Sequence, residues 1–227
     1  MKSSRERRGQ FVIIAVMLTA IMIVSIGTLM HGAITYYKHE PWEEYSTLIG
    51  DIEVNSRRVV ELSLAQATPY RGNVSILIGN LANWQNDLAD IYPSSGISLT
   101  SSGHQITQSS NATASTAWTT ASFMLNIRSI GLEGYKFSVS TFLSIDARND
   151  SSVEGYNIRA VVMNDRGALT GLDKSNFIIN GFSEPNAVTP FYDAELDTLV
   201  YRIQFQGTAA EVQVTDHRGI SVKDSTL

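Results

Sequence analysis

Apolar positions change their spacing along the chain, and each spacing predicts a different kind of structure. Residues 11–30 form an unbroken apolar run with no charged side chain and no proline. About 20 such residues, at roughly 1.5 Å of rise each, match the hydrocarbon thickness of a bilayer. Because backbone groups in lipid must bond to one another, this run predicts a helix. We therefore expect a transmembrane helix over residues 10–34.

A cleaved secretory signal is the first alternative for this run, and a buried core helix is the second. Secretory signals have an apolar core of roughly 7–15 residues, which is shorter than the run found here. The rest of the chain is not apolar enough to surround such a helix as a core. The pattern therefore favours a retained membrane helix.

Charged side chains flank the apolar run unevenly. The basic leader, residues 1–9, contains four cations and one acid, Glu6; the cations are Lys2, Arg5, Arg7 and Arg8. On the other side Lys38 alone stands close to the run, ahead of Glu40, Glu43 and Glu44. The positive-inside rule then places the amino terminus in the cytoplasm and the bulk of the chain outside the cell. We expect a single-pass protein of the cell membrane, with the lipid bilayer as its first partner.

Residues 35–92 predict an extracytoplasmic helical region. Apolar side chains recur at helical spacing up to Ala67, and a second stripe runs over residues 73–91. The intervening residues 69–72 begin with proline and end with glycine, which favours an antiparallel hairpin of two helices. We expect the two stripes to be buried against each other or against the next domain. A stripe left open for a partner helix is the alternative.

Residues 93–118 contain no charged side chain and are rich in serine and threonine. Such a stretch has little apolar surface to offset its ordering entropy, which favours an exposed connector. A small hairpin around residues 97–107 and a glycosylated stalk are the alternatives.

From residue 119 the apolar spacing switches to two, which is typical of strands with one buried face. Six or seven short runs of this kind, separated by turn residues, favour an antiparallel sandwich of immunoglobulin-like architecture over residues 119–227. The predicted fold class is thus α+β and membrane-anchored. It has an amino-terminal transmembrane helix, an amphipathic helical hairpin and then a β-sandwich.

Composition narrows the function further. The chain has 227 residues, no cysteine and a net charge of −5. Disulfides, thiol nucleophiles and thiolate metal sites are therefore excluded. An acidic chain also disfavours nucleic acid, because binding to phosphates requires a basic patch.

Catalytic and metal-binding patterns find little support. The four histidines are scattered, and neither a GxSxG elbow nor a GxxxxGK[ST] loop occurs. The acids Asp193, Glu195 and Asp197 alternate before a predicted strand and could bind calcium, although a solvated acidic loop is the commoner meaning. We expect a non-enzymatic protein without a cofactor or a metal.

Three Asn-x-Ser/Thr sequons lie on the side predicted to face outward, at Asn73, Asn111 and Asn149. N-linked glycosylation uses such sequons on exposed segments. Asn111 is the best acceptor candidate of the three, because its surroundings are the most polar.

Arg8, Gly9 and Gln10 stand directly before the apolar run, and Leu18 follows within it. This arrangement resembles the class III signal peptide of archaeal type IV pilins and related surface proteins. The resemblance covers about the first 35 residues. It implies that a prepilin peptidase cuts after Gly9, so that the mature chain begins at Gln10. Val12 and Ile14 stand where that family commonly has serine and glutamate, and an ordinary signal anchor with a basic leader is the alternative.

Two classes of function follow from these observations. The first is a pilin-like or other structural subunit of a cell-surface assembly, whose partners are copies of itself or other pilin-like subunits. The second is a single-pass anchored adhesin-like or ligand-binding ectodomain, whose sandwich loops contact a ligand.

Overall fold

The structure is a computed structural model that describes residues 3–70, 72–110, 115–150, 158–181, 184–206 and 209–225. Within these ranges, the side chains of residues 3–15, 33–44 and 110 are not described. The chain divides into two compact units, residues 1–52 and residues 53–227, and each unit is considered by itself.

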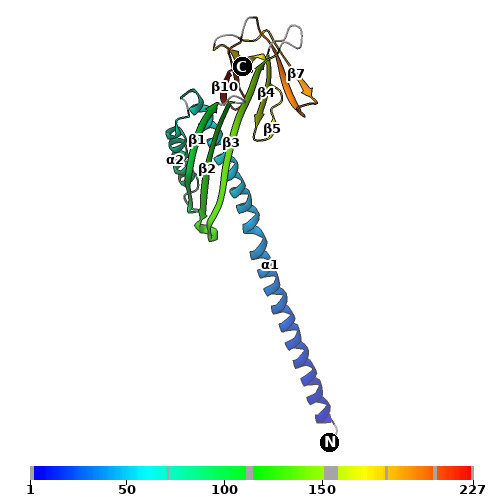
Figure 1. Ribbon diagram of the computed structural model, residues 1–227. Helices are drawn as coiled ribbons and strands as arrows, with labels where there is room; N and C mark the ends of the chain where they lie inside the picture. The colour runs from blue at the N-terminus through cyan, green and yellow to red at the C-terminus, as the bar shows by residue number, and fades with distance from the viewer. Residues whose placement is uncertain are drawn as a thin grey trace. The chain divides into compact units, whose positions relative to one another are not determined.

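Helix α1 spans Ser3–Ala67, so its residues up to 52 make up the described part of the first unit (Figure 1). The predicted helix over residues 10–34 lies inside α1, which continues through Pro41. Proline costs one backbone hydrogen bond inside a helix but does not by itself end one. The remaining turns of α1, residues 53–67, belong to the second unit.

The second unit begins with the predicted helical hairpin. After α1, the short 3-10 helix η1 (Thr68–Tyr70) leads to α2 (Val74–Ile91). Gly72 has a φ of +77° and donates its N–H to the carbonyl of Ala67 at 3.0 Å, which closes the carboxyl end of α1. Asn73 then caps α2, because its Oδ1 accepts the N–H of Ser75 at 3.0 Å.

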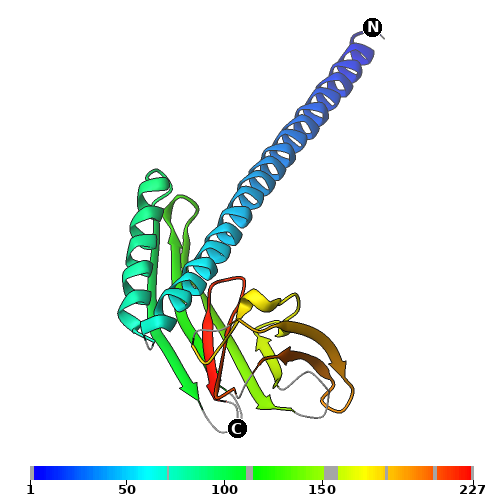
Figure 2. The ribbon, with the colours of Figure 1, turned by 90° about the horizontal axis from the view of Figure 1, so that it is seen from above.

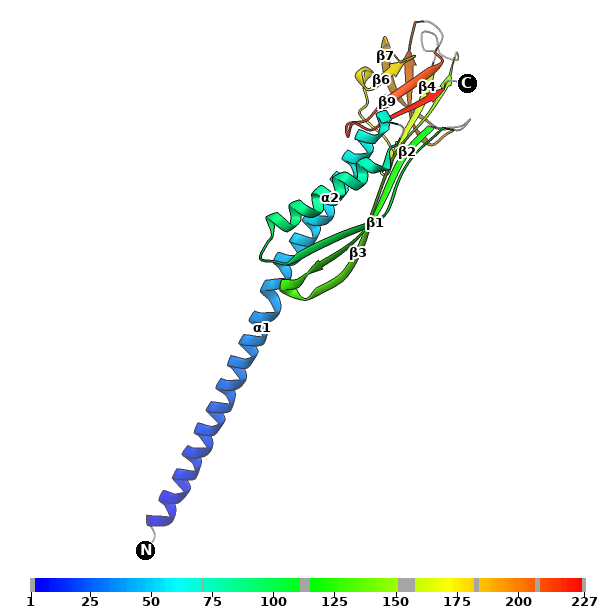
Figure 3. The same ribbon diagram turned by 90° about the vertical axis from the view of Figure 1, so that its left-hand side faces the viewer.

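Side-chain hydrogen bonds join α2 to the end of α1. The amide of Asn80 donates to Ser63 Oγ at 3.0 Å, and the indole of Trp84 donates to Ser56 Oγ at 3.1 Å. Because the later residue of α2 bonds to the earlier residue of α1, the two helices are antiparallel, as the sequence predicts. Figures 2 and 3 show α2 alongside this part of α1, over one end of the long strands.

The rest of the second unit is two antiparallel sheets. The main sheet has the strand order β1-β2-β3-β4-β8-β7, with β5 paired to β4, and the small sheet has the order β10-β9-β6. The strands are β1 (Ile97–Ser110), β2 (Ser115–Ile127), β3 (Leu132–Asn149), β4 (Ile158–Asn164), β5 (Gly167–Ala168), β6 (Phe177–Ile179), β7 (Ala187–Asp193), β8 (Thr198–Gln204), β9 (Glu211–Thr215) and β10 (Ser221–Ser225). Short 3-10 helices, η2 (Arg128–Ile130) and η3 (Lys174–Asn176), precede β3 and β6. Helices joined to a mostly antiparallel sheet body agree with the predicted α+β class.

The structure corrects the expectation of an exposed connector over residues 93–118. Among the described residues of this stretch, residues 97–110 form β1 and residues 115–118 begin β2, so the sheet body begins at Ile97 and not at residue 119. Ile97 and Leu99 are buried, and so are Ala117 and Thr119 on the facing strand. Ser98 and Thr100, which alternate with Ile97 and Leu99, are exposed, and a strand with one uncovered face needs apolar side chains at alternate positions only.

The core lies between the two sheets and receives Leu64 from α1. Alternate residues of β3, β4 and β8 face it, for example Leu143, Val162 and Ile203, which have no exposed surface. Tyr201 is also fully buried, and its hydroxyl donates to the carbonyl of Leu169 at 2.8 Å. Because the chain has no cysteine, this core stabilises the body without disulfides.

Candidate functional site

The most unusual surface of the described residues is an apolar segment of α1, residues 16–30. Its large apolar side chains are more than half exposed, and none is covered by the rest of the first unit; they are Val16, Met17, Leu18, Ile21, Met22, Ile23, Val24, Ile26, Leu29 and Met30. An apolar surface of this extent marks a site of contact with a membrane or with another protein.

The hydroxyl groups within this apolar segment bond to the helix itself. Ser25 Oγ donates to the carbonyl of Ile21 at 2.8 Å, and Thr28 Oγ1 lies 3.0 Å from the carbonyl of Val24. Such bonds leave no unsatisfied donor when the helix surface is covered by apolar groups.

Over the part of the chain whose side chains are described, no helix is long and apolar enough to cross a membrane. The expected transmembrane helix, residues 10–34, includes residues 10–15 and 33–34, whose side chains lie outside that part. The processing candidates Arg8, Gly9 and Gln10 fall within α1. They also lie outside the part of the chain whose side chains are described.

The three sequons are differently placed. Asn73 is exposed at the start of α2, and the hydrogen bond to Ser75 uses its oxygen and leaves the amide nitrogen, the atom that carries a glycan. Asn149 is exposed at the end of β3, while its sequon partner Ser151 lies outside the described residues. Asn111 also lies outside them.

Arg218 is the centre of an ionic cluster that the sequence did not predict. It follows Asp216 in the turn between β9 and β10, and its Nε lies 2.6 Å from the carboxylate of Asp216. Its Nη1 lies 2.8 Å from Asp165, in the turn after β4, and 3.7 Å from Glu61 of α1. The same nitrogen donates to Thr141 Oγ1 of β3 at 2.7 Å. One guanidinium thus joins the helix, the main sheet and the small sheet.

The charges of this cluster stabilise each other's ionised forms. Burial opposes ionisation of Asp165, but the hydrogen bonds to its carboxylate and the charge of Arg218 together outweigh burial and lower the pKa of Asp165 below its ordinary value of 3.8. For Arg218 burial again opposes the charged form, and the bond to Asp216 raises the pKa of the guanidinium. The cluster is a structural clamp. The only sequence signal for it is the turn Asp216-His217-Arg218-Gly219.

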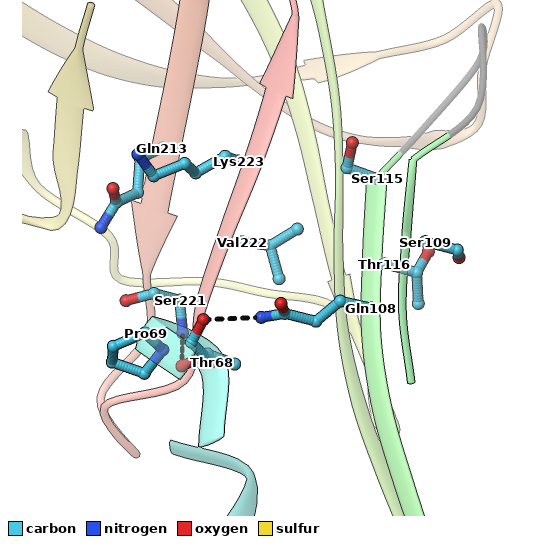
Figure 4. A pocket seen from close by; sticks show the side chains of 10 residues that line it. All are labelled: Thr68, Pro69, Gln108, Ser109, Ser115, Thr116, Gln213, Ser221, Val222 and Lys223. Carbon is cyan, nitrogen blue, oxygen red and sulfur yellow. Dashed lines mark hydrogen bonds between the residues drawn. The ribbon is translucent and has the colours of Figure 1, made fainter. Parts of the chain in front are cut away.

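A recess of about 640 Å³ lies where η1 meets β1, β2 and β10 (Figure 4). Its walls are mostly hydroxyl and amide side chains: Thr68, Gln108, Ser109, Ser115, Thr116, Gln213 and Ser221, with Pro69, Val222 and Lys223. Gln108 donates to the carbonyl of Thr68 at 2.9 Å, so part of this lining is already hydrogen-bonded. The lining residues of this polar recess, among which only Lys223 is charged, include no pair of groups suited to acid–base or nucleophilic chemistry.

The acidic residues near β7 do not form a cation site. Asp193 accepts the N–H groups of Glu195 and Leu196, and it also pairs with Arg159 at 3.4 Å. Asp197 accepts the hydroxyl of Tyr192 instead. Among the described residues, no group of three or more His, Asp or Glu side chains is placed to hold a metal ion.

No protein family, curated protein or solved structure matches this chain.

Proposed function

We propose that this chain is a non-enzymatic, membrane-anchored surface protein and a pilin-like structural subunit of a cell-surface assembly. Its amino-terminal helix is held in the bilayer before assembly, with the leader in the cytoplasm. The two-sheet body is displayed outside the cell. The same proposal includes an immunoglobulin-like sandwich architecture for this body.

The observation that carries this proposal is the exposed apolar surface of α1 between residues 16 and 30. Covering one large apolar side chain contributes about 1.5–3 kcal/mol, so ten such side chains are a strong driving force for burial. A helix that is apolar all round can be buried in two ways. Lipid surrounds it before assembly, and the helices of other copies surround it afterwards.

The arrangement of the body supports the same function. The later turns of α1, residues 53–67, pack onto the sheets of the second unit, and the Arg218 cluster fixes them there. One continuous helix therefore carries both the apolar segment and an anchorage for the folded body. A subunit whose helix enters the core of a filament needs both parts.

An anchored adhesin-like or ligand-binding ectodomain is the second candidate. The hydroxyl-lined cavity beside η1 favours it, because polar recesses with few charges suit neutral polar ligands. This function requires the anchor but no contact between copies.

Electron microscopy of cells that express the full chain, labelled with antibody against the body, tests the proposal. Labelled filaments are expected. Ile23→Lys, which places a charge within the apolar segment, should abolish them, while the exposed loop variant Thr170→Lys should leave them unchanged. Label spread over the cell surface without filaments would support the anchored ectodomain instead.

A further inference from the structure

Three arginines stand in one row across the main sheet. Strand register places Arg148 of β3 opposite Arg159 of β4, and Arg159 opposite Arg202 of β8. Arg202 in turn faces Thr189 of the edge strand β7. Directly opposite residues point to the same face of a sheet, with Cβ atoms about 4.5–5.5 Å apart. We call Arg148, Arg159 and Arg202 the arginine row.

The arginine row lies on the face of the main sheet that points away from the core. The chain neighbours Ala147, Ala160 and Tyr201 are buried in the core, and side chains alternate between the two faces along each strand. The row is therefore on the opposite side of the main sheet.

Among the described residues, two of the three arginines of the row have an ion-pair partner. Arg148 pairs with Asp146 at 2.9 Å, and Arg159 pairs with Asp193 at 3.4 Å. Arg202 has no carboxylate partner among the described residues; its guanidinium carbon lies 3.6 Å from the centre of the Phe191 ring. Its Nε is buried and has no hydrogen-bond partner in this part of the structure.

This arrangement favours an incoming carboxylate. Like charges directly opposite each other destabilise a sheet, and the cation–π contact holds Arg202 in place without neutralising it. A carboxylate at the end of the row would pair with Arg202 and accept hydrogen bonds from a guanidinium whose position is already fixed.

A matching pair of carboxylates lies on α2. Asp87 and Asp90 are exposed, and no described cation pairs with either of them. Residues three apart on a helix have Cβ atoms about 5–6 Å apart, close to the spacing between neighbours in the arginine row. Asn83 is exposed and precedes Asp87 by one helical turn, so it lies on the same side of α2.

The α2 helix cannot bring these carboxylates to the arginine row of its own chain. Its Gln85 donates at 2.8 Å to Ser101 of β1, whose register partner Phe123 is buried in the body. The helix thus lies on the core side of the sheet, beside edge strand β1, whereas the row ends next to the opposite edge strand β7. Asp87 and Asp90 can meet a row only on another copy.

We propose that Asp87 and Asp90 of one copy bind the arginine row of the next copy. This inference rests on the proposed function and specifies one of its contacts. The two surfaces are different, so the contact is head-to-tail, and a head-to-tail contact that does not close into a ring builds an open helical filament. The net charge of −5 disfavours random association of copies, which leaves a local cationic row as the place where acidic copies attract.

Cross-linking tests the contact, and the cysteine-free chain permits it without background. Asn83→Cys with Thr189→Cys in the full chain leaves all five charged residues in place. Oxidation of surface filaments should give a ladder of disulfide-linked multimers on a non-reducing gel. Asn83→Cys with Thr170→Cys is the matched control and should give none. Filaments without a ladder from the first pair overturn the contact but leave the proposed function standing. Absence of filaments from the unaltered chain overturns both.

Charge reversal gives a second, independent test. Asp87→Lys with Asp90→Lys lies on an exposed helix face and leaves the body's core untouched. We expect at least a tenfold loss of sedimentable filaments, and adding Arg202→Glu to this pair should restore part of that loss. Arg166→Glu, at an exposed arginine outside the row, should have no effect. Unchanged filaments from the double lysine variant would overturn the contact.

Discussion

Arg218 and Asp165 are joined by a 2.8 Å ion pair that connects two turns on different sheets of the body. Asp165 follows β4 of the main sheet, whereas Arg218 precedes β10 of the small sheet. The side chain of Arg218 is only 11% exposed, so its charge must be matched within the protein. The pair therefore holds the two sheets together at this end, with the core packed between them.

Removing the cation of this pair should destabilise the body strongly. Arg218→Met leaves the buried carboxylate of Asp216 without its counter-charge, and loss of one partner of a buried pair typically costs about 3–5 kcal/mol. Urea unfolding of the full chain in detergent, followed by tryptophan fluorescence, measures this change. The matched control Arg166→Met, at an exposed arginine, should stay within about 0.5 kcal/mol of the unaltered chain. Equal midpoints for the two variants would contradict the clamp.

Acid should weaken the same clamp. Although burial raises it, the hydrogen bonds to Asp165 and the charge of Arg218 together hold the pKa of this carboxyl below its ordinary value of 3.8, so the unfolded chain binds this proton more readily than the folded chain does. The stability contributed by Asp165 is present above about pH 4 and is lost as pH falls through the lowered pKa. Thermal melts between pH 6 and pH 2 should show this decline. In Asp165→Asn the melting temperature should be lower at pH 6 and should fall less steeply in acid. An identical acid slope in the variant would contradict the assignment.

The core should be sensitive to truncation on β3 and β8. Leu143 and Ile203 have no exposed surface, and Leu143→Ala or Ile203→Ala should each cost about 2–5 kcal/mol of unfolding free energy. Met163 stands on the uncovered face of β4 and is 40% exposed, so Met163→Ala should cost far less. Chemical denaturation of the three variants compares them directly. A cost at Met163 equal to that at Leu143 would show that the two faces have been assigned the wrong way round.

Much of this fold could be predicted from local pattern. Period-two alternation identified β2, β3, β4 and β8, and helical spacing with the Pro69 to Gly72 break predicted the hairpin. Strand β1 was missed because its exposed positions are serine and threonine, and an uncovered strand face needs no apolar side chain. Strand β7 was missed because Pro190 interrupts it, which an edge strand tolerates.

The sites were less predictable than the elements. Arg218 meets Glu61, Thr141 and Asp165 only because a helix, a strand and two turns that are distant in sequence come together. The arginine row depends on register between three strands, and no local spacing encodes that register. The apolar run, by contrast, is continuous in the sequence and needs no tertiary information.

Glycan is expected at Asn111 in the native host, because the sequence around this residue is polar and uncharged. Mass spectrometry of the peptide that contains Asn111 should show added hexose mass, and Asn111→Gln should remove it. Recovery of this peptide only in its unmodified form would reject the prediction.

A pilin-like subunit and a permanent anchor differ most clearly in whether the chain is cleaved at Arg8-Gly9-Gln10. A prepilin peptidase would cut after Gly9, where the missing side chain lets the backbone enter a narrow protease site. Cleavage removes the leader cations, each of which costs about 2.5–3.5 kcal/mol at the middle of a bilayer by insertion scales. The helix could then leave the membrane and pack among copies. Gly9→Val, with a branched side chain at the cut, should stay unprocessed.

Sequencing the amino terminus of the protein from native membranes and filaments tests the proposed function most directly. The pilin-like subunit predicts a chain that begins at Gln10, together with a full-length chain and no filaments for Gly9→Val. A native chain that begins at Met1 or Lys2 would contradict it and would identify a permanently anchored surface protein.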